Sequence, residues 1–255
     1  TVHPDYTYTP VEERRLIVNS SDGLNHVYTR LLYDKLREVR SFDLEVKDVL
    51  TGKTLKKARL KDMGDAASYS FSDVLDDNRY KYYEVTASKY PIEVLIRTEV
   101  FTKTNYYLPV WYPILHYNQK VVESTYTISY PSEFGLKYKE IKLPGERTRT
   151  EFEGVTTIKW IAKDLPVIAK GHDPRDVPTL LVAPVKFAME QYHGEMNDWA
   201  GLALWNYELN KGRDELPEDF KAKIQDLVSE LDDPYEKVKI LYSYLQKNFR
   251  YVSIQ

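Results

Sequence analysis

Alternation of apolar and polar side chains between residues 92 and 161 constrains this chain most strongly, because it fits strands and not helices. One face of this segment is apolar and the other mostly polar: Ile92, Val94, Ile96 and Val100 lie on the first, and Glu93, Arg97, Glu99 and Lys103 mostly lie on the second. The same period of two returns over residues 122–130, and turn residues separate that segment from further alternating ones. Short strands divided by turns are typical of antiparallel sheets that pack face to face. The sequence therefore predicts an antiparallel β-sandwich.

Segments on either side extend this β-rich part. Residues 14–19 are predicted as a short strand, and residues 42–60 as a hairpin that turns at a Thr-Gly pair. Residues 164–184 contain four prolines and no periodicity, which indicates ordered connecting chain. Residues 185–192 fit one last strand. We therefore expect a first domain, the antiparallel β-sandwich, over residues 1–192.

The remainder, residues 193–255, has helical periodicity. Asn197 is the expected N-cap of a first helix, in which Trp199 and Trp205 are predicted to face inward. Pro217 opens a second helix, and Asp233 caps a third. The predicted fold class is mainly β with C-terminal helices (α+β), an antiparallel β-sandwich followed by a three-helix segment.

The second and third helices carry apolar stripes that need cover. These stripes are Phe220, Ile224, Leu227, Val228 and Leu231 on the second helix, and Val238, Leu241, Tyr242, Leu245 and Phe249 on the third. A short link favours an antiparallel helical hairpin, in which Leu227→Ala or Leu241→Ala would each cost about 2–5 kcal/mol if both leucines are core. Residues 250–255 alternate like a strand without sheet neighbours, so we expect them to be frayed or paired with another chain.

Zero cysteines exclude disulfides, thiolate nucleophiles and sulfur-based zinc sites from this chain. The five histidines are scattered without a helical pair, and His193 with Glu195 is only a weak candidate pair of metal ligands. His172-Asp173-Pro174, Asp76-Asp77-Asn78 and Asp232-Asp233 are interpreted as turns or caps. We expect no catalytic residue, no cofactor and no metal, although a hydrolase with two converging carboxylates stays an open alternative. A net charge of −3 gives no reason to expect nucleic acid, and no apolar run is long enough to span a membrane.

The helix over residues 234–249, followed by Arg250-Tyr251-Val252, resembles the entry into a bacterial transglutaminase-like domain of the cysteine peptidase type. Gly52-Lys53-Thr54, the block 183–192, the tryptophan helix and Leu216-Pro217-Glu218 occur in the order seen in envelope proteins that place a β-rich domain of unknown function before that catalytic domain. The resemblance implies that the catalytic cysteine, histidine and aspartate lie downstream, and that Arg250 and Tyr251 pack beneath the active site. It also implies an exported protein, periplasmic or at the cell surface. Residues 193–255 would then be the N-terminal part of the catalytic domain.

Two functions follow as expectations. The first is a non-catalytic accessory module that positions a substrate or partner for the downstream catalytic domain of the exported parent protein. The second is a stand-alone β-sandwich binding module for glycan or peptide, suggested by aromatic residues between strands, Tyr106, Tyr107, Trp111 and Tyr112. These rings either bind a ligand such as a peptide, protein or glycan, or they close one end of the sandwich core.

Overall fold

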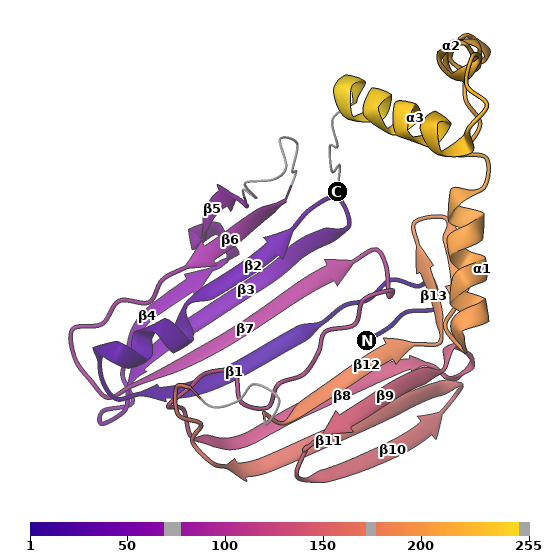
Figure 1. Ribbon diagram of the computed structural model, residues 1–255. Coiled ribbons are helices and arrows are strands. Elements are labelled where there is room, and N and C mark those ends of the chain that lie inside the picture. The colour runs from indigo at the N-terminus through magenta and orange to yellow at the C-terminus, as the bar shows by residue number, and fades with distance from the viewer. Residues whose placement is uncertain (69–77, 172–176, 250–255) are drawn as a thin grey trace.

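The computed structural model describes residues 1–68, 78–171 and 177–249, and it shows antiparallel β-sheets followed by three C-terminal α-helices (Figure 1). The strands are β1 (Val11–Val18), β2 (Thr29–Tyr33), β3 (Arg37–Asp48), β4 (Thr54–Arg59), β5 (Gly64–Ala67), β6 (Arg79–Tyr83), β7 (Ile92–Thr102), β8 (Val121–Pro131), β9 (Leu136–Ile141), β10 (Glu146–Phe152), β11 (Val155–Leu165), β12 (Thr179–Pro184), β13 (Lys186–Met189) and β14 (Tyr192–Glu195). Three short 3-10 helices are η1 (Ser21–Val27), η2 (Leu60–Asp62) and η3 (Ser132–Phe134). The predicted fold class, mainly β with C-terminal helices, is confirmed.

A first pair of sheets occupies the N-terminal part of the chain. A four-stranded sheet of order β1-β7-β3-β4 and a three-stranded sheet of order β2-β6-β5 share one hydrophobic core. In that core, Leu44 of β3 lies opposite Ile96 of β7, and Val46 lies opposite Val94. The alternation in the sequence thus marks the buried face correctly, because successive strand residues point to opposite faces. The predicted hairpin over residues 42–60 is β3 and β4.

A second pair of sheets has a core of its own. A three-stranded sheet of order β10-β11-β8 and a two-stranded sheet of order β12-β9 enclose it. Ile128 of β8 lies opposite Ile158 of β11, and Trp160 is buried beside them. The Nε1 of Trp160 donates a hydrogen bond to Oε1 of Glu140 at 2.8 Å. The expected sandwich therefore consists of two sheet pairs with separate cores.

The N-terminal residues connect the two pairs. The amide of Val2 donates to the carbonyl of Ser129 in β8 at 2.8 Å. Tyr8 exchanges two backbone hydrogen bonds with Thr102 of β7, each of 2.8 Å. Val2 and Tyr8 are also bridged to each other, and both side chains are buried in the second core. A short hairpin thus bonds to β8 through its first arm and to β7 through its second.

The region before the helices departs from the prediction of connecting chain and one strand. The end of the stretch 164–184 forms β12, whose Leu180 is fully buried and exchanges backbone hydrogen bonds with Trp111. The apolar run Leu180-Leu181-Val182 is too brief to reveal a period, and only Leu180 of the three is buried, in the second core. Residues 185–195 form a hairpin of β13 and β14, and the expected boundary after residue 192 falls inside β14.

Helix α1 (Trp199–Asn210) packs on β14. Its N-cap is Asp198, whose Oδ1 accepts from the amide of Gly201 at 2.8 Å, whereas Asn197 bonds to Glu195 instead. Trp205 is buried at 8% exposure, as predicted, but Trp199 is 85% exposed and the prediction for it is wrong. Six residues are not a whole number of turns of about 3.6 residues, so these two rings lie on different faces of the helix.

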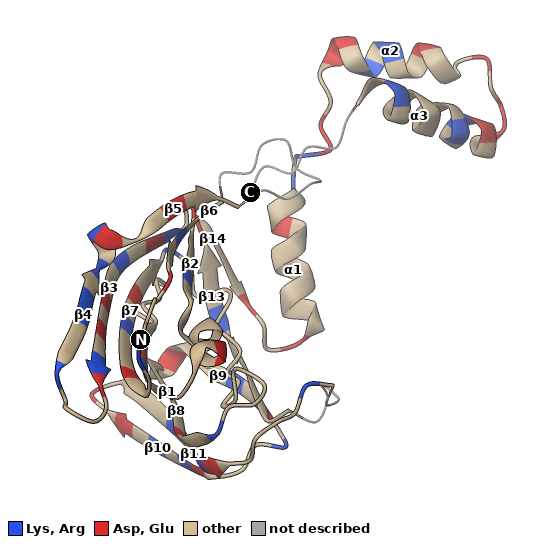
Figure 2. Cartoon of the chain, turned by 90° about the vertical axis from the view of Figure 1, so that its left-hand side faces the viewer, with Lys and Arg blue, Asp and Glu red and all other residues tan. Residues whose placement is uncertain are grey.

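Helices α2 (Glu218–Val228) and α3 (Pro234–Asn248) contact each other and project from the strands (Figure 2). The ring of Phe220 lies 6.0 Å from that of Phe249, which confirms the expected contact between their stripes. Neither helix has a buried residue, so the premise that Leu227 and Leu241 are core is wrong. Both leucines keep solvent contact, and alanine there should cost less than full burial implies. The predicted strand over residues 250–255 lies outside the described residues.

Candidate functional site

A groove of about 2760 Å³ lies along two strands that belong to different sheet pairs. Every residue of β1 from Val11 to Val18 lines it, as do residues Val121 to Thr127 of β8. Among the described strands, each of these two is the last in its sheet and has no neighbour on one side. The segment 107–120, which links β7 to β8, supplies much of the remaining wall. The groove is thus bounded by sheet edges from both halves of the β-rich part.

The free edge of β1 can be assigned residue by residue. Hydrogen-bonded pairs alternate along antiparallel strands, and Tyr8 forms such a pair with Thr102. Tyr8 and β1 pair with β7 in one register, so the even-numbered residues of β1 also direct their backbone amides and carbonyls to β7. The amides and carbonyls of Val11, Glu13, Arg15 and Ile17 therefore point away from β7, and among the described residues no backbone group bonds them.

The same counting applies to β8. Ser132 donates its amide to Gly154 at 2.8 Å, so even-numbered residues of β8 direct their backbone groups to β11. Odd-numbered residues point to the free edge, which agrees with the carbonyl of Ser129 accepting from Val2. Beyond that bond, Glu123, Thr125 and Thr127 present amides and carbonyls with no backbone partner in the described chain. Two unpaired edges thus line one groove.

Charges of both signs alternate across the sheet that carries β1 (Figure 2). One row crosses four strands as Glu13, Arg97, Asp43 and Arg59. Glu13 forms an ion pair with Arg97, and on the next odd-numbered position Arg15 pairs with Glu93 at 2.5 Å. These exposed pairs add little stability, but they balance the charge beside the groove. The arrangement gives no single-sign field of the kind that attracts nucleic acid.

The four aromatic residues predicted as possible ligand contacts are divided by the structure. Tyr106 stacks on Trp205 with centroids 5.1 Å apart and meets Phe187 at 4.8 Å, so it packs under α1. Trp111 joins the second core and donates its Nε1 to Oγ of Ser124 at 3.2 Å. Tyr107, at 73% exposure, and Tyr112 line the groove with their rings accessible. Tyr107, Trp111 and Tyr112 therefore line the groove, although Trp111 is also held in packing, and Tyr106 alone is held entirely in packing.

The segment that carries these rings is anchored by a buried amide. Asn105 is fully buried, its Nδ2 donates to the carbonyl of Lys186, and its Oδ1 accepts from the amide of Ala188, each at 3.1 Å. Thr104 donates its hydroxyl to the carbonyl of Ala188 at 2.5 Å. Because these bonds satisfy buried polar groups, the start of the segment is fixed against β13.

Two histidines that are ninety residues apart in the sequence meet at the groove. The rings of His26 in η1 and His116 are parallel, with centroids 4.6 Å apart. Arg14 of β1 lies beside them and donates to the carbonyl of His26 at 3.4 Å. Burial, and then the neighbouring His26 and Arg14, lower the pKa of His116 from its usual value. Sequence spacing gave no sign of this pair, since only the tertiary fold brings it together.

We expect this contact to make stability depend on pH. The neutral form of His116 is favoured in the folded chain, so its contribution is present above the unfolded histidine pKa of about 6.5 and is lost as pH falls through the lower folded pKa. Urea unfolding at pH 8, 7, 6 and 5 should show wild-type stability falling on acidification, with a shallower fall for His116→Gln. Equal slopes for the two proteins would show that His116 does not titrate as described.

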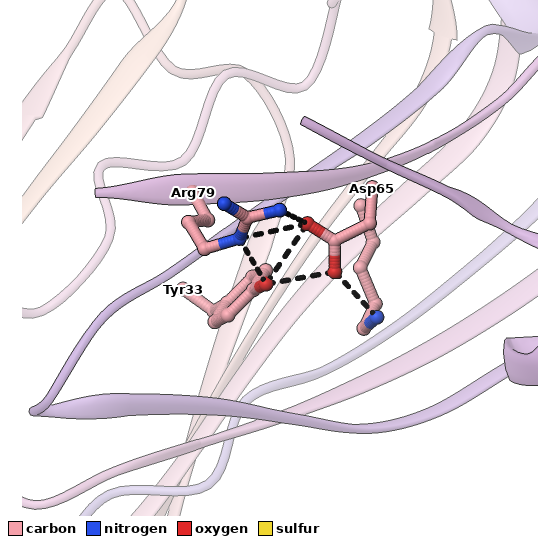
Figure 3. A network of polar contacts seen from close by, with 4 residues as sticks. Tyr33, Asp65 and Arg79 are labelled. Carbon is pink, nitrogen blue, oxygen red and sulfur yellow. Dashed lines mark hydrogen bonds and ion pairs between the residues drawn. The ribbon is translucent and has the colours of Figure 1, made fainter. Parts of the chain in front are cut away.

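A second polar cluster lies on the sheet β2-β6-β5 (Figure 3). The hydroxyl of Tyr33 donates to Oδ2 of Asp65 at 2.7 Å, Arg79 pairs with Oδ1 at 2.7 Å, and Lys81 reaches Oδ2 at 3.0 Å. Hydrogen bonds from Tyr33, Lys81 and Arg79 lower the pKa of Asp65 to about 2. Every member of the cluster is satisfied by another, which is typical of a structural network.

Other candidate chemistry finds no support among residues 1–68, 78–171 and 177–249. No three His, Asp or Glu side chains gather there to hold a metal ion. His193 lies on β14 with its ring 4.8 Å from Tyr6, and Asp233 caps α3 through the amide of Tyr235. His172-Asp173-Pro174, Asp76 and Asp77 lie outside the described residues. Within the described part, no helix is both long enough and apolar enough to cross a membrane.

The sequence did hold one overlooked signal for the groove. Four consecutive charges, Glu12 to Arg15, occupy the middle of β1. Charged side chains are a common protection of edge strands against aggregation. These four charges therefore indicate a strand that lies at the edge of its sheet, as β1 does.

Comparison with known proteins agrees with the fold. A crystal structure from Parabacteroides distasonis, described as a "putative protease", superposes with a TM-score of 0.70 at 15% sequence identity. The match covers 100% of this chain and 49% of that one, so this chain spans about half the length of that protein. The curated proteins gave no match. A family model described as a domain of unknown function with solved structure (DUF3857) matches residues 4–169, which is more than half of the chain. The chain therefore belongs to the DUF3857 family.

Proposed function

We propose that this chain is a non-catalytic module that positions a substrate or partner for a transglutaminase-like catalytic domain encoded downstream in a longer, exported protein. The observation that carries the proposal is the groove of about 2760 Å³ between two unpaired sheet edges. A long open groove walled by backbone groups and exposed rings suits holding a chain-like ligand. The chemistry is assigned to a cysteine, histidine and aspartate beyond residue 255.

Two further observations support the longer protein. The structurally similar chain is about twice as long, and its description names a protease. The apolar faces of α2 and α3 remain exposed at the end of the β-rich part, with Val238 and Tyr242 each more than half accessible. Such faces are normally covered, and a following domain would cover them. Export to the periplasm or the cell surface belongs to the same proposal through the resemblance of the closing helix.

Two experiments test this proposal: sequencing the gene beyond residue 255, and measuring the kinetics of the longer protein that it encodes. Reading the frame past residue 255 should reveal a cysteine followed by a histidine and an aspartate, whereas a stop codon would refute the proposal. In the longer protein, Ile17→Trp and Thr125→Trp fill the groove from its two sides. We expect the KM for a polypeptide substrate to rise about tenfold with kcat unchanged, because binding remote from the reacting atoms is lost.

The matched control is Val155→Trp, at an exposed strand position that does not line the groove. Its KM should equal that of the wild type, and a small amide substrate should be processed equally by all four proteins. Unchanged KM values in both groove variants would contradict a positioning role.

The exposed rings favour one second candidate. Tyr107 and Tyr112 line the groove and could stack on sugar rings, which would make the module a stand-alone glycan binder. Titration with a soluble oligosaccharide, followed by tyrosine fluorescence, would then saturate in the wild type and fail in Tyr107→Ala. The peptide-positioning role predicts no such saturation.

A further inference from the structure

We propose that the groove takes an extended polypeptide segment as an added β-strand along the free edge of β1, between β1 and β8. This inference rests on the proposed function and deepens it by naming the class of ligand. It concerns four residues of β1, Val11, Glu13, Arg15 and Ile17, whose backbone groups point into the groove.

The chain itself shows that an extended segment fits between the two sheet systems. At one end, residues 1–9 form a hairpin, and its first arm lies between Tyr8 of the second arm, which is paired with β7, and Ser129 of β8, to which Val2 donates its amide at 2.8 Å. Beyond this segment, the same two sheets continue as β1 and β8 with their edges unpaired. An added strand would therefore continue an existing interface by the same backbone chemistry.

Backbone pairing decides the class of ligand. Alternate residues of β1 offer one amide and one carbonyl each at strand spacing, and Thr125 and Thr127 of β8 offer the same from the opposite side. An extended peptide carries donors and acceptors at this repeat along both of its edges. A sugar chain or a nucleic acid strand does not carry that repeat. The balanced charges beside β1 agree with a ligand of little net charge.

A second copy of the protein fits the groove less well than a single strand. A partner edge strand brings its whole sheet, and here the groove has β8 on its other side and the segment 107–120 along its wall. A lone peptide brings no sheet behind it. The groove therefore suits an extended segment of another polypeptide, and dimers of this chain are the alternative that sedimentation tests.

Side chains on the odd-numbered residues indicate which sequence an antiparallel strand would prefer. Opposite Ile17, Arg15, Glu13 and Val11, the favoured order is apolar, acidic, basic and apolar, because cross-strand pairs of opposite charge stabilise and like pairs destabilise. Residues 9–19 of this chain present that order themselves, at Val11, Glu13, Arg15 and Ile17. In this register Arg14 of such a peptide would lie opposite Arg14 of β1, so a peptide of residues 9–19 with glutamine in place of that arginine is a defined probe.

The first experiment measures fluorescence anisotropy of this probe, labelled and acetylated, added to the purified chain. Arg15→Pro removes one outward amide while sparing the bonds to β7, and proline is tolerated at such an edge position. We expect saturable binding to the wild type and a loss of about tenfold in affinity for Arg15→Pro, as for one hydrogen bond.

The matched control is Arg149→Pro, because Arg149 lies at an outward position on the edge strand β10, away from the groove. It should bind the probe like the wild type. No saturable binding up to about 1 mM, or equal affinity in both proline variants, would overturn the inference.

Exchanging two charges of β1 distinguishes a probe that pairs with the free edge of β1 from a probe that displaces β1 from β7. In Glu13→Arg/Arg15→Glu, a probe with its acidic and basic residues exchanged should bind about tenfold tighter than the original probe. A probe that displaced β1 would instead face Arg97 and Glu93 in both proteins, so the preference would not reverse. A preference that does not reverse would overturn the inference.

Three outcomes distinguish this inference from dimer formation and from the broader proposal. Concentration-dependent dimers in sedimentation, lost in Arg15→Pro, would assign the edge to a second copy and overturn peptide binding. If the probe fails to bind while Ile17→Trp still raises the KM of the longer protein, strand addition is refuted and the positioning role is supported. If the probe binds and the frame ends at residue 255, the peptide site is supported and the link to a downstream catalytic domain is refuted.

Discussion

Replacing Trp160 with alanine is expected to destabilise the chain by about 3–5 kcal/mol. This ring is 2% exposed at the centre of the second core, so its removal loses apolar burial and leaves a cavity. It also removes the donor to Oε1 of Glu140, a bond of 2.8 Å. Since Tyr126 and Tyr138 pack on the same ring, at 6.0 and 5.3 Å, their packing should loosen with it.

Urea unfolding followed by tryptophan fluorescence and by far-ultraviolet circular dichroism would measure this loss. Phe152→Ala is the matched control, because that ring lies in the adjacent strand β10 and is 74% exposed. Its free energy of unfolding should change by less than about 0.5 kcal/mol. A loss below about 1 kcal/mol for Trp160→Ala would show that the second core is not built around this ring.

Trp205→Ala should have a similar cost of about 3–5 kcal/mol, while Trp199→Ala in the same helix should cost almost nothing. Trp205 is enclosed by Phe187 and Tyr106, each with centroids 5.1 Å away. Gly194 of β14 lies so close beneath it that an added Cβ would meet the indole at 2.7 Å. The packing of this one side chain therefore holds α1 against the β-rich part.

Limited proteolysis and urea unfolding would measure the release of α1. In Trp205→Ala, cleavage within residues 199–210 should become faster, because the helix loses its main contact. Trp199→Ala should be cleaved at the wild-type rate. Equal behaviour of the two variants would contradict the assignment of one ring to packing and the other to solvent.

Local patterns predicted the strands and the buried faces well. Buried residues alternate with less buried ones from Phe42 to Val46 of β3 and from Ile92 to Thr98 of β7, and this local period can be recognised without knowing the partner strand. Asp233 was likewise assigned correctly, since an N-cap bonds within its own turn. These features depend on neighbours in sequence, which is why the sequence alone could predict them.

The groove depends on partners far apart in the chain. Whether β1 lies at an edge or inside a sheet is decided by β7, some eighty residues away, and the same holds for the contact of His26 with His116. The aromatic segment shows the same limit: Tyr106 is held by Trp205, and Tyr107 beside it is exposed. Residue type predicted that rings gather there, but tertiary contacts decided which remain available.

Amide hydrogen exchange of the purified chain, with and without the probe peptide of residues 9–19, tests the central claim most directly. In the free chain, the amides of Val11, Glu13, Arg15 and Ile17 should exchange quickly, and those of the even-numbered residues between them should be protected by β7. Adding the peptide should protect the odd-numbered amides of β1, and those of Thr125 and Thr127 across the groove. Fast exchange that persists at these amides while the peptide is bound would contradict the account.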